Sequence, residues 1–246
     1  MTNELDLARM TYVQVQAYFG KKNIALLPVG STEQHGLHLP LGTDFLLATA
    51  LAKDVASKTE TLLLPTIPYG ISKHHRRFPT VWITPQTFRD LVSQIVLSFK
   101  PHGLKKVVLV NGHGGNTMAL GEVAEELLGE DIRCIVWEWW KTEPIEKLLR
   151  EKAGPELGTI THADLGETSM ALAHFEDSIQ MDQAKDHPLT NWAPRVHGAV
   201  VHFSTHEFTE IGSLGAPTRA SRELGEELRV IALRELELAL RWLEKH

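Results

Sequence analysis

Three short polar segments carry side chains that could perform chemistry, and the first is GSTEQHGLHLPLGTD at residues 30–44. In an extended segment alternate side chains share a face, so Glu33 and His35 point the same way while Gln34 points away. A carboxylate beside an imidazole suits a zinc, manganese or iron(II) ion. Asp44 follows the turn-prone LPLG, which would return the chain to the same edge. The alternative is a solvated strand end, with Asp44 as a helix cap.

The second segment is NGHGGN at residues 111–116, between an apolar run and a helical pattern. Its glycines would let the backbone approach a ligand closely, and His113 could coordinate a metal there. A phosphate-binding loop is the competing interpretation, because backbone N–H groups at a helix start attract anions. The segment is not GxGxxG, and no GKS or GKT follows it, so the metal interpretation is favoured.

The third segment is HADLGETS at residues 162–169, at the start of an amphipathic pattern. Glu167 could bind a metal, but an acid in a first helical turn is also favoured by the helix dipole alone. His162 could transfer protons, or it could be a local cap or a surface residue. Each of the three segments is ambiguous when taken alone.

The elements that must position these segments are typical of an α/β protein with a parallel-rich sheet. We expect strands at residues 24–29, 61–67, 106–110 and 131–137, and a short extended piece at 81–84. We expect helices after Asp44 and at residues 85–98, 117–128, 165–175 and 221–243. Residues 185–217 give no clear pattern. Ligands bind beyond the carboxyl ends of such strands, so the polar segments that follow them, YGISKHH at residues 69–75 included, should meet at one edge.

The bulk composition excludes several classes of function. The 246 residues carry 25 basic and 31 acidic side chains, a net charge of −6, and so lack the basic surface of most nucleic-acid-binding proteins. The single cysteine, Cys134, lies in an apolar run and should be a buried, inert thiol. The N-terminus is unlike a signal peptide, and no stretch is apolar enough to cross a bilayer. We expect a cytoplasmic protein that binds neither nucleic acid nor membranes.

Taken together, GSTEQHGxHLPLGTD, NGHGGN and HAxxxETS resemble the creatininase (creatinine amidohydrolase) family. ARMTYVQV, YGIS-x-x-H-x-x-FP and HEFTEIGSLGAPTRAS resemble the family in the same order, so the resemblance covers nearly the whole chain. It implies one domain over residues 1–246, folded as a three-layer α/β/α sandwich with a mostly parallel central sheet. It also implies a small-molecule substrate and a homo-oligomer, often a hexamer.

The resemblance implies two divalent metal ions per chain, which could be zinc, manganese or iron. By position, Glu33 and His113 would bind one ion and His35 the other, with Asp44 bridging both.

One ligand of the family pattern is missing. In some members a glutamate two residues after the loop histidine binds the second ion, and this chain has Gly115 there. Our own inference is that Glu167 replaces it. His162 matches the family's proposed acid/base histidine, so we assign His162 and Glu167 as the catalytic residues. The glutamate that precedes this histidine in creatininase is Thr161 here.

The pocket residues argue against creatinine as the substrate, because pocket walls set specificity. Creatininase has an aromatic residue after the loop histidine and a tryptophan shortly before the acid/base histidine, where this chain has Gly114 and Gly158. The residues expected to bind substrate are His75, Gly114, Gly115 and Asn116.

Two pairs of neighbouring side chains have roles that the sequence leaves open. Arg76 and Arg77 could grip an anionic group of the substrate or lie on a solvated loop. Trp139 and Trp140 could stack on a ligand or fill a core.

These residues predict a divalent-metal-dependent hydrolase that cleaves a C–N bond in an amide, cyclic amide or formamide through a metal-activated water. One alternative is a C–C hydrolase that acts on a cyclic polyol ketone with the same metal site. Another is a non-catalytic, metal-binding member of the family. The complete set of Glu33, His35, Asp44 and His113 favours an enzyme.

Overall fold

The computed structural model describes residues 5–154, 160–187 and 202–246. A sheet of four parallel strands lies at the centre, in the order β2–β1–β3–β4. The strands are β1 (Ile24–Val29), β2 (Leu62–Leu63), β3 (Lys106–Asn111) and β4 (Arg133–Glu138). The register aligns Val29, Asn111 and Glu138 at the carboxyl ends of the longer strands, so the loops that follow begin side by side.

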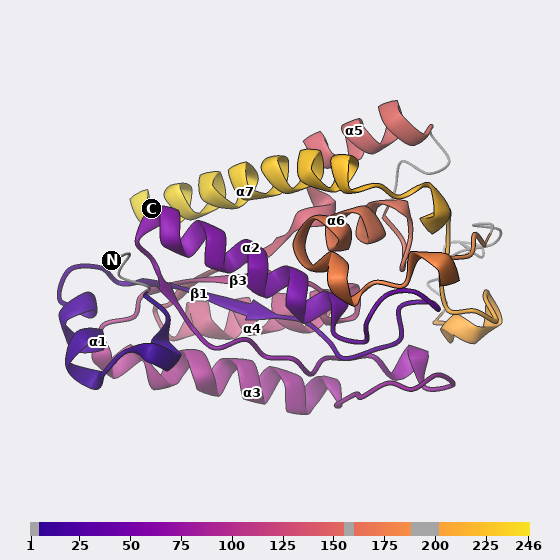
Figure 1. Cartoon of the computed structure of the whole chain (residues 1–246). Helices are drawn as coiled ribbons and strands as arrows, with labels where there is room; N and C mark the ends of the chain where they lie inside the picture. Colours follow the sequence, from indigo (N-terminus) through magenta and orange to yellow (C-terminus); the bar gives the residue numbers. More distant parts are fainter. Residues whose placement is uncertain (1–4, 155–159, 188–201) are drawn as a thin grey trace.

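Helices cover both faces of this sheet, as Figure 1 shows. One layer contains α2 (Thr43–Thr59), α5 (Glu143–Ala153), α6 (Leu165–Phe175) and α7 (Arg222–Lys245). The other contains α1 (Tyr12–Phe19), α3 (Pro85–Ser98) and α4 (Thr117–Gly129). The predicted fold class, a three-layer α/β/α sandwich with a parallel sheet, is therefore confirmed.

Alternating side chains of the buried strands supply two separate cores. In β1, Ile24 and Leu26 contribute to the core beneath α2 and α7, while Ala25 and Leu27 contribute to the core beneath α3 and α4. Every residue of β1 is buried, which is typical of a parallel strand covered on both faces. This burial fixes the ends of the strands and therefore the start of each polar loop.

The predicted strand at residues 61–67 is too long. Only β2 remains of it, because Pro65 has no N–H to donate to a neighbouring strand. Beyond Pro65 the chain pairs with β1 again at an isolated parallel bridge between Val29 and Ile67.

Two helices, α1 and α5, are absent from the sequence-based prediction. Five of the eight residues of α1, YVQVQAYF, are β-branched or aromatic types that favour strands, but Thr11 and Gln14 form a capping box that starts a helix. In contrast, α5 carries a recognisable signal, with proline and glutamate in its first turn and basic residues in its last. The remaining predicted helices and strands agree with the structure to within two residues at each end.

Three further expectations concern membrane-spanning helices, the single cysteine and the region of unclear pattern. Among the described residues, no helix is both long and apolar enough to cross a membrane. Cys134 is half-buried on β4, and burial raises the pKa of its thiol to about 12, so the thiol stays protonated. Within the region of unclear pattern, residues 188–201 lie outside the described residues, and 3₁₀ helices η8 (Thr205–Glu207) and η9 (Pro217–Arg219) follow.

Two glycines within helices lead to opposite predictions for stability. A Cβ at Gly225 on α7 would collide with the carbonyl of Ser169 on α6, whereas a Cβ at Gly121 on α4 would meet nothing within 4 Å. We expect Gly225→Ala to lower the free energy of unfolding by about 1–3 kcal/mol, because the two helices must separate. Gly121→Ala should raise it by about 0.5–1 kcal/mol, because glycine loses more backbone entropy on folding. Urea unfolding measures both, and equal stability of the two variants would contradict the close packing of α6 on α7.

Candidate active site

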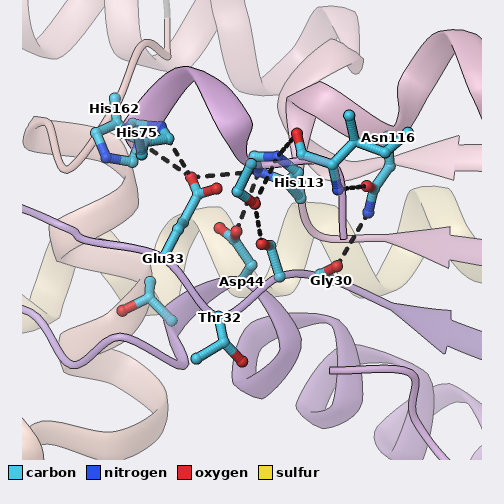
Figure 2. Close-up of polar contacts among 12 residues, drawn as sticks. Gly30, Thr32, Glu33, Asp44, His75, His113, Asn116 and His162 are labelled. Atoms are coloured by element: carbon cyan, nitrogen blue, oxygen red, sulfur yellow. Dashed lines mark hydrogen bonds and ion pairs between the residues drawn. The ribbon is translucent and has the colours of Figure 1, made fainter. Parts of the chain in front are cut away.

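Buried polar side chains from distant parts of the chain converge at the carboxyl edge of the sheet (Figure 2). The loop after β1, the first turn of α2, the 3₁₀ helix η2 (Lys73–His75), the loop after β3 and the start of α6 supply them. They are Glu33, His35, Asp44, His75, His113, His162 and Glu167, each between 0 and 7% exposed. All except His35 border a cavity of about 180 Å³. The three polar segments therefore meet at one edge, as predicted.

Asp44 lies between two sets of possible ligands. Its Oδ2 is 3.1 Å from His113 Nδ1, and Glu33 Oε1 is 3.3 Å from the same nitrogen. Its Oδ1 is 3.0 Å from His35 Nε2, which is 3.6 Å from Glu167 Oε1. One carboxylate thus presents one oxygen to each set, the arrangement that a bridging ligand requires.

Backbone carbonyls orient the two imidazoles of these sets. His113 Nε2–H donates to the Ile71 carbonyl at 3.2 Å, and His35 Nδ1–H donates to the Glu33 carbonyl at 3.0 Å. When the rings are neutral, this leaves His113 Nδ1 and His35 Nε2 unprotonated, and these are the nitrogens that face Asp44. A histidine that binds a metal through one nitrogen commonly donates from the other in this way.

The charges of the cluster control its pKa values. Burial alone would lower the pKa of His35 and of His113, but nearby carboxylates outweigh burial and raise both pKa values well above the ordinary value. The carboxylate with the largest effect is Asp44 for His35 and Glu33 for His113. Burial alone would raise the pKa of Glu33, but His113 and His75 lower it well below the usual range. Without a metal, protons on the histidines supply the positive charge that the carboxylates need.

The donors present fit divalent cations. Glu33 Oε2 is fully buried and accepts no hydrogen bond, and Asp44 Oδ2 is fully buried and faces His113 Nδ1, which has no hydrogen to donate when the ring is neutral. An ionised oxygen in such a place is costly unless a positive charge compensates it. Each set combines one imidazole nitrogen with carboxylate oxygens, the ligand types that zinc, manganese and iron(II) accept.

Hydrogen bonds beneath the NGHGGN loop hold His113 in place. Asn111 Nδ2 donates to the His113 carbonyl at 2.8 Å and to the Glu138 carboxylate at 2.6 Å, and Asn111 Oδ1 accepts from the His113 N–H at 3.1 Å. Asn116 donates to the Gly30 carbonyl at 3.0 Å and accepts from the Ile71 N–H at 3.0 Å. Figure 2 shows the Asn116 amide directed toward Gly30 rather than toward Glu33. The structure therefore does not bring Asn116, expected to bind substrate, into the cavity.

Gly115 and Gly114 differ in the space around them. A Cβ at Gly115 would collide with His113 Nε2 and with the Ile71 carbonyl, whereas a Cβ at Gly114 would meet nothing within 4 Å. Both glycines line the cavity. A side chain at position 115 would therefore have to displace His113.

Glu167 lies beside His35, and the backbone before α6 orients its carboxylate. The Ala163 N–H donates to Glu167 Oε2 at 2.6 Å, which leaves Oε1 free to face His35. Ala163 has φ of 47°, in the left-handed region that an L-residue rarely adopts. Asp164 caps the helix by accepting from the Glu167 N–H at 2.9 Å. Local strain of this kind is typical of functional sites.

His75 and His162 approach Glu33 from the other side. Glu33 Oε1 is 3.2 Å from His75 Nε2 and 3.8 Å from His162 Nδ1. Burial, together with the positive fields of His75 and His35, lowers the pKa of His162 well below its ordinary value. His162 is therefore neutral at pH 7 and can accept a proton.

The structure distinguishes the members of the two pairs whose roles the sequence left open. Trp139 is fully buried in the core, whereas Trp140 lines the cavity, with its ring at right angles to that of Trp139. Arg76 and Arg77 are exposed and are not among the residues that line the cavity. Gly158 lies outside the described residues.

The sequence analysis did not identify His74, Ile160 and Thr161 as residues that line the cavity. It also gave no role to Gln34, which contacts His75 and His162. His74 stacks on His113 with ring centroids 5.6 Å apart, and burial lowers its pKa to about 3. Its place beside His75 in YGISKHH was a usable signal, but spacing alone does not tell which of two adjacent histidines faces a site.

Comparison with known proteins extends these observations. The family model for creatininase, described as creatinine amidohydrolase, matches residues 8–240. The chain is 28% identical to creatinine amidohydrolase of Pseudomonas putida, over 98% of each chain. It is 31% identical to 3-dehydro-scyllo-inosose hydrolase of Thermotoga maritima, over 76% of this chain and 62% of that protein.

The fold of a solved relative agrees with this match. A structure of a mutant creatininase of the Zn–Zn type superposes with a TM-score of 0.85 at 27% identity, and the match covers 98% of this chain and 99% of that one. The similarity thus extends over almost the entire sequence and includes all three polar segments. This chain belongs to the creatininase family of hydrolases.

Proposed function

We propose that this protein uses two divalent metal ions to hydrolyse the C–N bond of an amide, cyclic amide or formamide in a small molecule. The observation that carries the proposal is the position of Asp44, with one oxygen facing Glu33 and His113 and the other facing His35 and Glu167. The Zn–Zn designation of the structurally similar creatininase supports two ions. In this proposal Glu167 supplies the ligand that Gly115 cannot.

Divalent ions held by these side chains would supply the Lewis acidity that polarises a carbonyl group and activates water. The chain's own residues then have separate tasks. His162, neutral and next to Glu33, would carry a proton to the leaving nitrogen. Trp140 and Ile160 provide apolar walls that exclude bulk water from one side of the cavity.

Creatinine itself is disfavoured as the substrate. The open space beside Gly114 lacks the aromatic wall expected in creatininase, and Thr161 stands where a glutamate precedes the acid/base histidine. The Thr161 hydroxyl instead donates to the Leu214 carbonyl at 2.9 Å, which fixes it to the backbone. A pocket with different walls selects a different substrate.

The second candidate function is C–C hydrolysis of a cyclic polyol ketone at the same metal site. The 31% identity to an inosose hydrolase favours it. A parallel assay of zinc- and manganese-loaded protein with creatinine, small cyclic amides, formamides and inosose-type ketones separates the two. The absence of bound metal and of all activity would support the third possibility, a non-catalytic member of the family.

Assembly as a homo-oligomer and a cytoplasmic location stay predictions.

The metal assignment predicts a stoichiometry. Wild-type protein should bind about two zinc ions per chain, and Glu167→Gln should retain about one, because the second set of ligands loses a carboxylate. His113→Ala should likewise lose an ion from the first set. Elemental analysis after dialysis measures this, with the exposed Glu176→Gln as the matched control. Two ions in the Glu167→Gln protein would rule out Glu167 as a ligand.

The acid/base assignment predicts a kinetic effect. His162→Ala should keep its metal and its fold but lose roughly a hundredfold or more in kcat, as is usual when a general acid/base is removed. Steady-state kinetics and elemental analysis on the same sample provide the test. Wild-type turnover by the variant would remove His162 from the mechanism.

The pKa values predict that protons compete with the metal. Because the pKa values of His35 and His113 are raised in the metal-free protein, both histidines carry protons at neutral pH, and zinc must displace them. Zinc affinity should therefore rise from about pH 6 to about pH 8, with protons released on binding. Calorimetric titration of metal-stripped protein in two buffers of different ionisation enthalpy counts the protons. A binding enthalpy that is the same in both buffers would contradict the assignment.

A further inference from the structure

Gln34 is a buried residue that the metal and acid/base assignments leave unused. Its side chain points away from the two sets of ligands, as the strand pattern predicted, and only 4% of the residue is exposed. The amide nitrogen Nε2 nevertheless lies 2.8 Å from His75 Nδ1 and 2.8 Å from His162 Nε2. Gln34 therefore contacts, from behind, both histidines that face Glu33.

Backbone groups fix which way the Gln34 amide points. The Gly36 N–H, which can only donate, donates to Gln34 Oε1 at 3.0 Å. The Gly212 carbonyl, which can only accept, accepts from Nε2 at 3.2 Å. A flipped amide would lose both bonds, so Nε2 must be the atom that faces the histidines.

One arrangement of the remaining hydrogens gives every acceptor a donor, and it leaves the 2.8 Å contact between Gln34 Nε2 and His162 Nε2 without a hydrogen bond. Nε2 has two hydrogens, and the Gly212 carbonyl takes one. His162 Nε2 has another acceptor, the Gln34 carbonyl at 2.8 Å, to which it can donate. The second hydrogen of the amide then goes to His75 Nδ1, which has no other partner in these contacts.

We propose that Gln34 is a positioning residue that sets the tautomers of His75 and His162. His75 then carries its proton on Nε2 and donates it to Glu33 Oε1 at 3.2 Å, which makes it a hydrogen-bond donor rather than a metal ligand. His162 carries its proton on Nε2 and keeps Nδ1 unprotonated on the side of Glu33. The catalytic consequence rests on the proposed function, but the tautomers themselves do not.

The IGSLG segment at residues 211–215 packs against Gln34 and helps to orient its amide. Gly212 has φ of 88°, in the left-handed region that glycine tolerates best, and a Cβ there would collide with Gln34 Oε1. The Gly212 N–H donates to Thr209 Oγ1 at 3.1 Å, which fixes the turn. The segment thus closes over Gln34 and presents the carbonyl that orients its amide.

The test uses Gln34→Glu, which keeps the shape and the acceptor for Gly36 but removes the donor. Protein with ¹⁵N-labelled histidine is prepared metal-free at about pH 8, above the ordinary imidazole pKa. Long-range proton–nitrogen spectra then report which ring nitrogen carries the proton, with assignments from His75→Gln and His162→Gln. We expect protons on Nε2 of both rings in the wild type, and a shift to Nδ1 on His75 in Gln34→Glu, since the new carboxylate can only accept.

Kinetics of the zinc-loaded protein, on whichever amide the wild type hydrolyses, complete the test. We expect kcat to fall roughly ten- to a hundredfold in Gln34→Glu, with KM and zinc content nearly unchanged. Gln14→Glu is the matched control, because the Gln14 side chain acts only as an acceptor in its capping box. Gly212→Ala should reproduce the loss and serves if Gln34→Glu does not fold.

Two results would overturn the proposal. One is a wild-type His75 with its proton on Nδ1. The other is a Gln34→Glu protein with unchanged ring protonation and unchanged kcat. A wild type that binds no zinc and hydrolyses no amide would instead defeat the proposed function, while the spectra still decide the tautomers.

Discussion

Three carboxylates, those of Glu33, Asp44 and Glu167, lie almost out of contact with water in one small cluster. Removing an ionised group from water costs several kcal/mol even after the protein relaxes, so each charge needs a compensating partner. The partners present are His35, His75 and His113, together with one backbone donor, the Ala163 N–H, for Glu167. Glu33 and Asp44 each keep one buried oxygen without a hydrogen bond. Holding so much negative charge away from water is the constraint that the rest of the site accommodates.

The fold meets this constraint by placing polar loops at the end of a fully buried sheet. Because β1 and β3 are packed on both faces, the loops that follow them begin at fixed points. Asn111 and Asn116 hold the loop of His113, and Ala163 aims Glu167. Gly115 has no room for a side chain, and Glu167 presents a carboxylate oxygen to His35 from the start of α6.

Much of this could be predicted from the sequence, and the failures have physical causes. Periodicity located the long strands and helices, and the rule that ligands lie beyond strand ends placed Glu33, His75 and His113 at one edge. Glu167 was inferred instead from the ligand missing at Gly115. Pro65 shortened β2, and a capping box turned the strand-like residues of α1 into a helix. Asn116 was expected at the substrate, but its amide is used by backbone groups of distant segments. Such partners depend on tertiary structure, which spacing within one segment does not encode.

Anomalous diffraction from crystals grown with zinc would show whether Asp44 bridges two ions, because it locates each ion without reference to activity. We expect two anomalous peaks, one on each side of Asp44. One should lie among Glu33, Asp44 and His113, and the other among His35, Asp44 and Glu167. A single peak, or zinc bound away from Asp44 while these carboxylates keep their places, would contradict it.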